Sequence, residues 1–125
     1  FVVIQKGAVV HTAEGRGVKP IRELLDVHPG RLHGAVVADK IIGKAAAMLL
    51  HKGGVSGVYG EVMSKPGYEY LKDHGIRAEY GRCIDVISNR EGDGICPLER
   101  SVLEIHDPDE AFIVLKETIR KLMSA

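Results

Sequence analysis

The sequence predicts an α/β domain, a three-layer α/β/α sandwich built on a mixed sheet. A hairpin opens the chain, and short apolar runs then alternate with helical segments through short joins. Such alternation implies parallel strands connected by right-handed crossovers. At 125 residues the chain has the length of one ordinary domain, so we expect one unit over 1–125.

The first two strands are predicted at 1–5 (FVVIQ) and 8–12 (AVVHT), both rich in β-branched residues. Gly7 between them can adopt the positive φ of a tight hairpin turn. These two strands therefore form the antiparallel part of the mixed sheet.

A short helix is predicted from Pro20, a residue that suits a first turn, to the Pro29-Gly30 stop. The apolar run 34–38 (GAVVA) is typical of a strand buried on both faces. Asp39 follows as the expected N-cap of a helix over 40–52.

A second parallel strand is predicted at 55–63, followed by a helix from Pro66 to His74 and a third strand at 76–80. The next apolar run, 83–88 (CIDVIS), fits either a strand or a short helix. The chain then reaches a C-terminal amphipathic helix, which Asp107 caps. Its expected apolar stripe consists of Phe112, Leu115, Ile119 and Leu122.

Charge and composition narrow the classes of partner. Lys plus Arg equals Asp plus Glu at 17 each, without a long run of either sign, so we expect neither nucleic acid nor membrane as a partner. Small molecules or other protein chains are expected instead. Two cysteines, Cys83 and Cys96, are too few for a disulfide framework, and there is no signal-peptide pattern, so we expect a cytoplasmic protein.

Ligands of open α/β sheets bind outside the carboxyl ends of the parallel strands. This rule selects the segments 39–44, 64–66 and part of 81–96. Asp39 there can bind a hydroxyl or amino group, or serve only as a helix cap. Lys40 and Lys44 can hold a phosphate, or be solvated.

Arg16 lies between two glycines just before a helix start, where backbone amides can turn toward an anion. The alternative is a plain flexible connection, because neither glycine-rich phosphate-loop pattern is present. Six histidines invite a metal search, but the chain lacks the spacings C-x-x-C, H-E-x-x-H and H-x-E. We therefore expect no metal and no cofactor.

The segment NREGDGICPLER (89–100) combines a polar, glycine-containing loop with a helix start. As a calcium loop it fails, because Arg100 stands where the bidentate Glu belongs. As a helix start it places Cys96 at the N-cap, Pro97 first and Glu99 third, where Glu99 can reach back to the cap amide. A thiol at a helix N-terminus is a better nucleophile, so Cys96 is a candidate nucleophile as well as a cap.

With GAVVADKIIGKAAAMLL, EYG and NREGDGICPLE, the chain resembles, nearly end to end, a small uncharacterised prokaryotic family whose fold is similar to cytidine deaminase. Zinc deaminases carry H-x-E or C-x-E at one helix start and P-C-x-x-C at the next. Here Asp39 and Ile41 stand at the first motif. At the second, Gly67 and Tyr70 replace the cysteines. The resemblance therefore implies the fold without the zinc chemistry.

The leading hypothesis is a zinc-less, deaminase-like domain that binds a nucleotide or a related phosphorylated small molecule. Besides the lysines, Arg90 is a candidate for phosphate contact, and Asn89 and Asp93 for recognition, if 81–96 folds over the Asp39 pocket. A second hypothesis is an enzyme with Cys96 as nucleophile and Asp39 or Glu99 as proton carrier. A third is an interaction module that self-associates through an exposed strand edge or helix.

Overall fold

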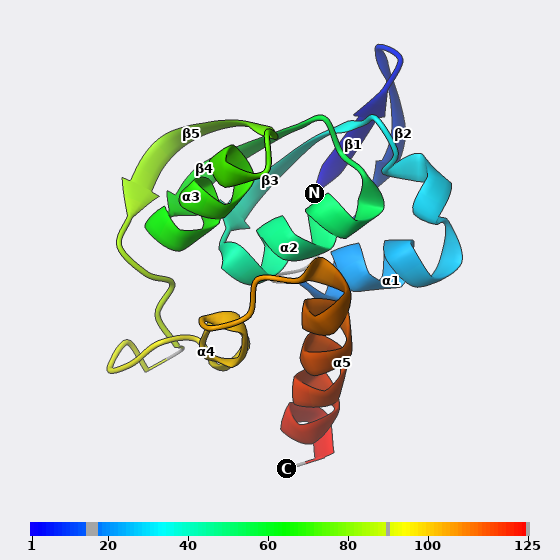
Figure 1. The fold of residues 1–125 in the computed structure, drawn as a ribbon. Coiled ribbons are helices and arrows are strands. Elements are labelled where there is room, and N and C mark those ends of the chain that lie inside the picture. Colours follow the sequence, from blue (N-terminus) through cyan, green and yellow to red (C-terminus); the bar gives the residue numbers. More distant parts are fainter. Residues whose placement is uncertain (15–17, 90, 125) are drawn as a thin grey trace.

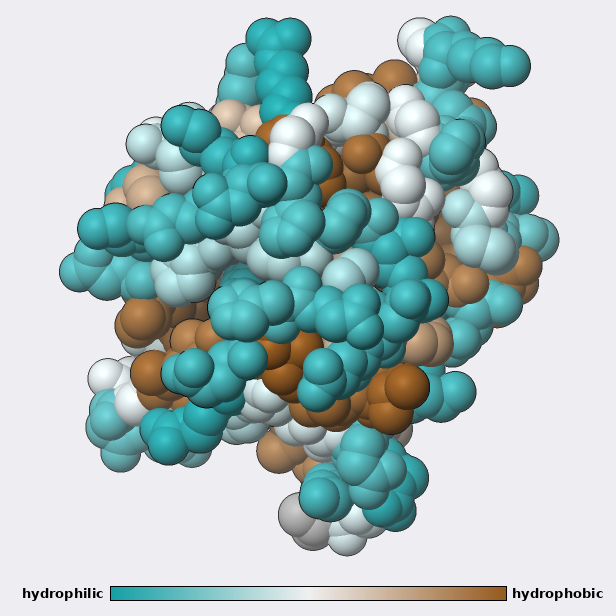
Figure 2. Space-filling view, viewed as in Figure 1, coloured by the Kyte–Doolittle hydropathy of each residue, from teal (hydrophilic) through white to brown (hydrophobic). Residues whose placement is uncertain are grey.

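The computed structural model describes residues 1–14, 18–89 and 91–124. The strands are β1 (Val2–Gln5), β2 (Ala8–Thr12), β3 (Val36–Ile42), β4 (Gly57–Ser64) and β5 (Arg77–Ile84). The helices are α1 (Lys19–Val27), α2 (Lys44–Gly53), α3 (Lys65–Asp73), α4 (Pro97–Val102) and α5 (Pro108–Ser124), with a 3-10 turn, η1 (Pro29–Arg31). Figure 1 shows their arrangement, and Figure 2 shows in the same view that hydrophilic residues cover most of this face.

The five strands form one mixed sheet in the order β2-β1-β3-β4-β5. β1 pairs antiparallel with β2 and β3, whereas β3, β4 and β5 are parallel. The hairpin turn uses Lys6 and Gly7, both with positive φ (52° and 79°). The predicted α/β class, the hairpin and the mixed, open sheet are confirmed.

The elements form three layers, as predicted, in the order sheet, then α1, α2 and α3, then α4 and α5 (Figure 1). Helices α1, α2 and α3 lie against one face of the sheet, and α4 and α5 pack behind α2. The other face of the sheet exposes side chains such as Val36, Tyr59 and Glu79. No helix within the described residues is long and apolar enough to span a membrane.

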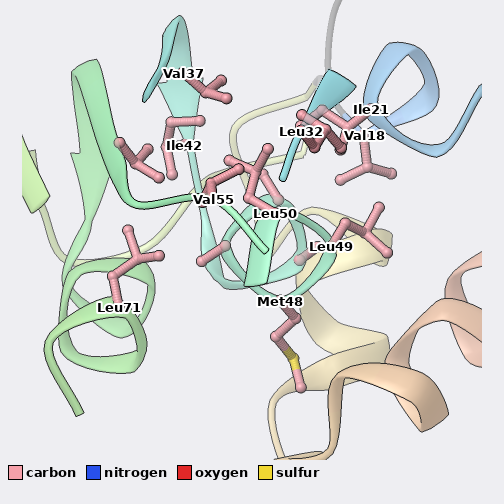
Figure 3. Packing of buried hydrophobic residues seen from close by; sticks show 14 of the residues in the cluster. Val18, Ile21, Leu32, Val37, Ile42, Met48, Leu49, Leu50, Val55 and Leu71 are labelled. Carbon is pink, nitrogen blue, oxygen red and sulfur yellow. The ribbon is translucent and has the colours of Figure 1, made fainter. Parts of the chain in front are cut away.

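Helix α2 is the centre of the core. All seven residues from Lys44 to Leu50 are buried, so this helix has no solvent-facing side over that stretch. In Figure 3 its side chains point in all directions: Leu50 lies on the side of Val37 and Ile42 of the sheet, and Met48 points away from them. A helix that is apolar on every side is stable only when other elements surround it.

Two predicted boundaries are wrong, and the reason is strand pairing. Asp39 is not a helix cap, because β3 continues through it to Ile42 and pairs with β4 as far as Met63. The helix expected from residue 40 therefore begins at Lys44, after Gly43. Likewise β5 extends to Ile84, and so takes in the start of the ambiguous run 83–88.

The C-terminal helix is close to its prediction. The Asp107 carboxylate accepts hydrogen bonds from the amides of Asp109 and Glu110, as expected of a cap. Leu115 and Ile119 are buried and Phe112 packs partly against the core, but Leu122 is half exposed. The predicted apolar stripe is therefore correct except at its last position.

Two glycines allow α3 to approach the start of α2. A Cβ atom on Gly67 would lie 2.8 Å from the carbonyl carbon of Gly43, closer than side-chain carbons normally come. Gly67 also donates its amide to the Ser64 hydroxyl, the N-cap of α3, at 3.1 Å. The close packing of the two helix starts therefore depends on the missing side chain at 67.

Gly67→Ala should lower the free energy of unfolding by about 1–3 kcal/mol, because the added methyl overpacks a buried contact. Gly30→Ala is the matched control, since a Cβ atom on the exposed Gly30 meets nothing within 4 Å. Urea unfolding of both variants measures the difference. Equal stabilities would contradict the packing described here.

Candidate functional site

The carboxyl ends of β3, β4 and β5 lie side by side, as the pairing of Ile42 with Met63 and of Ser64 with Ile84 requires. The chain after β5 closes over this edge. A side chain on Gly43 would collide with Glu99 Oε1 and Ile87 Cδ1, so both groups sit directly against Gly43. The crevice where α/β sheets usually bind ligands is therefore filled by the chain itself.

Glu99 is the polar centre of this closure. Its Oε1 accepts the Lys44 amide at 2.7 Å and its Oε2 accepts the Ala45 amide at 3.1 Å. These are first-turn amides of α2, which have no partner within the helix. Gly43, the N-cap of α2, has no side chain to offer, so the cap comes from Glu99, which is 55 positions after Lys44.

Lys44 completes the cluster around Glu99. Its Nζ donates to the carbonyl oxygen of Leu103 at 2.8 Å. Burial lowers the pKa of Lys44 and raises the pKa of Glu99; the amide hydrogen bonds from Ala45 and Lys44 and the charge of Lys44 oppose the shift of Glu99. The Lys44 side chain thus binds the backbone at the C-terminal end of α4. It does not face solvent, where a phosphate could bind.

The predicted local role of Glu99 is wrong. Instead of Glu99, the carbonyl oxygen of Ile87 accepts the Cys96 amide, at 2.9 Å. Cys96 is the N-cap residue of α4, as predicted, but its thiol makes no capping hydrogen bond. Because both Glu99 oxygens are bound to amides, this carboxylate is not poised to carry protons for Cys96.

Asp39 lies three residues before the end of β3. Its Oδ1 accepts the amide of Lys40 at 2.7 Å and lies 3.9 Å from the nitrogen of Phe1. The side chain is 14% exposed. Lys40 is exposed on the same strand. Lys40 and Lys44 therefore do not lie on one helix, which the predicted helix over 40–52 would require.

Asn89 and Asp93 close a local turn. Asn89 Nδ2 donates to Asp93 Oδ1 at 2.9 Å, and the Asp93 amide donates to Asn89 Oδ1 at 3.2 Å. A bridge between Ser88 and Ile95 closes the base of the turn. Such side-chain bonds are typical of Asx turns, so the structure gives both residues a conformational role.

Not all of the predicted site residues come together. Arg16 and Arg90 lie outside the described residues. Across the described parts of the chain, no hydrogen bond or ion pair joins Asp39, Cys96 and the turn at Asn89. Within the same parts, no group of three or more His, Cys, Asp and Glu side chains is placed to hold a metal ion.

A cluster of histidine and tyrosine side chains between α2 and α3 was not predicted from the sequence. Buried Tyr70 shares a hydrogen bond through its hydroxyl with His51 Nδ1 at 2.8 Å, and its carbonyl oxygen lies 2.7 Å from His74 Nδ1. Burial, with a smaller contribution from Asp107, raises the pKa of Tyr70 to about 12. The cluster fastens the C-terminal ends of the two helices together.

A cleft between α3 and β5 is a second feature that was not predicted from the sequence. It has a volume of about 330 Å³, and its lining includes Tyr68, Lys72 and Arg77. The Arg77 guanidinium donates to Glu79, which the other face of the sheet exposes, so Lys72 is the cation of this cleft. Lys72 Nζ lies 5.3 Å from the centre of the Tyr68 ring. The available signal was an aromatic and a lysine at i and i+4, followed by an arginine at the start of the next strand.

Glu99→Ala should destabilise the fold by about 2–5 kcal/mol, because it leaves two buried amides of α2 without an acceptor. Glu99→Gln should cost less, since one oxygen remains to accept. Glu23→Ala, on the exposed side of α1, is the matched control and should change stability by under about 0.5 kcal/mol. Thermal unfolding followed by circular dichroism measures all three. A stability of Glu99→Ala equal to that of the control would rule out the cap.

Comparison with known proteins gives a family but no activity. A crystal structure of a DUF1893 family protein (TM1506) from Thermotoga maritima is similar, with 32% sequence identity and a TM-score of 0.83. The similarity covers 93% of this chain and 78% of that one. No curated protein matches.

The family model "TM1506: Domain of unknown function (DUF1893)" matches residues 1–119. The predicted resemblance to an uncharacterised family is thereby confirmed, while the likeness to cytidine deaminase stays a prediction. By this match and by its similarity to the Thermotoga maritima structure, the chain belongs to the DUF1893 family.

Proposed function

We propose that this domain binds a nucleotide or a related phosphorylated small molecule in the cleft between α3 and β5. The observation that carries the proposal is one cleft whose lining combines an aromatic residue, Tyr68, with a cation, Lys72. An aromatic face can stack on a base, and lysine and arginine bind phosphate oxygens.

The size and charge of the cleft support such a ligand. Its volume of about 330 Å³ reaches the lower end of the range of small-molecule pockets, and because the cleft is shallow and open we expect a small ligand bound at the surface. Within the described residues, Lys72 has no ion pair, so its charge is available to an anion. Arg77 also lines the cleft, but its guanidinium pairs with exposed Glu79 at 2.9 Å, so the proposal rests on Lys72.

Because the carboxyl ends of the parallel strands are covered, we favour the cleft between α3 and β5 over the predicted site around Asp39. Glu99 and Ile87 fill the crevice at Gly43, and the cleft lies instead near the amino end of β5. A ligand role for Asp39, Lys40 and the turn at Asn89 stays a prediction. Cys83 and Cys96 are both free thiols, which suits the reducing cytoplasm where we propose that the domain acts.

AMP should raise the melting temperature of the protein, because a ligand that prefers the folded state stabilises it by about 2.7 kcal/mol at 100 times its Kd. Adenosine should give a smaller shift, since it lacks the phosphate. Lys72→Glu should remove most of the AMP shift by placing a carboxylate in the cleft. A thermal-shift titration with AMP, adenosine and inorganic pyrophosphate measures this.

Lys116→Glu, an equal charge change on the exposed side of α5, is the control and should leave the AMP shift intact. An AMP shift that survives in Lys72→Glu would move the site away from this cleft. The absence of a shift with all three compounds would contradict the proposed function.

A further inference from the structure

We propose that two copies of this chain associate through their β5 edges and so form one continuous sheet. Among the described residues, β5 is the last strand of the sheet and pairs with β4 alone, on its inner side. Its other side therefore presents a row of backbone N–H and C=O groups to solvent, a ready template for another strand.

β5 lacks several devices that protect sheet edges, although it carries the charged residues Arg77, Glu79 and Arg82. It is eight residues long, contains neither proline nor lysine, and exposes six residues. The opposite edge, β2, has only five residues, and its pairing with β1 shifts register between Val3 and Ile4. Natural sheet edges are commonly short or irregular. The β2 edge is both, whereas the β5 edge is long and regular.

The order of side chains along β5 favours a second copy as the partner. In an antiparallel pairing about a two-fold axis at Gly81, Arg77 lies opposite Asp85 of the other copy, and Tyr80 lies opposite Arg82. Each pair occurs twice by symmetry, which gives two opposite-charge pairs and two contacts between a cation and an aromatic ring. The strand is thus complementary to itself.

Gly81 fits the position on the axis. In its own chain a Cβ atom there would lie 2.9 Å from the Glu61 carbonyl oxygen, so this position cannot carry a side chain without adjustment. In the paired arrangement the two glycines face each other and allow the backbones to meet. Exposed Tyr59, on the neighbouring strand, adds apolar surface beside the joint.

Arg77 lies both in this pairing and beside the proposed ligand cleft, whereas Asp85 belongs only to the pairing and Lys72 only to the cleft, so Asp85→Arg and Lys72→Glu test the two proposals separately. Sedimentation equilibrium of the purified chain should show a reversible monomer–dimer equilibrium. Asp85→Arg places two arginines opposite each other at both ends of the pairing and should weaken association about tenfold or more. Arg77→Asp should do the same with two carboxylates.

The double variant Arg77→Asp with Asp85→Arg exchanges the charges and should restore dimerisation. All three variants should keep the wild-type circular dichroism spectrum, because both residues are exposed. A chain that stays monomeric at high concentration would overturn the inference. So would a dimer whose dissociation constant none of the charge changes alters.

Discussion

The fold depends on one constraint: helix α2 is buried on every side, so its first amides cannot turn to water. Seven consecutive residues, Lys44 to Leu50, are buried between the sheet, two flanking helices and the pair α4–α5. If such amides had no hydrogen-bond acceptor, the fold would lose as much stability as it would by losing several surface contacts. Glu99 accepts hydrogen bonds from two of these amides, so the start of α2 can be buried away from water.

The capping of α2 by Glu99 also affects which surfaces are open to a ligand. Because Glu99 reaches α2 from a helix 55 residues further on, the C-terminal segment is drawn across the ends of the parallel strands. The packing of Ile87 on Gly43 completes this closure, and the usual binding crevice of an open sheet is occupied. Both surfaces proposed for binding lie along β5: the cleft beside α3 on one side and the strand edge on the other.

Local sequence patterns were sufficient for the hairpin, the alternation of strands and helices, and the capped helix α5. They failed where a long-range contact overrides a local signal. Asp39 reads as a helix cap, yet pairing with β4 extends the strand past it. Glu99 reads as the third residue of a capping box, but a distant helix with no cap of its own competes for its carboxylate. A helix as apolar as AAAMLL does predict complete burial, but not which residue satisfies its start.

Amide hydrogen exchange at Lys44 and Ala45 tests the central role of Glu99 most directly. If the Glu99 carboxylate holds both amides in the interior, they should exchange as slowly as amides in the middle of α2, through unfolding of the whole domain. First-turn amides of an uncapped helix exchange quickly. Rapid exchange of Lys44 and Ala45 in an otherwise protected α2 would show that the helix start is not held by Glu99, and would contradict the account.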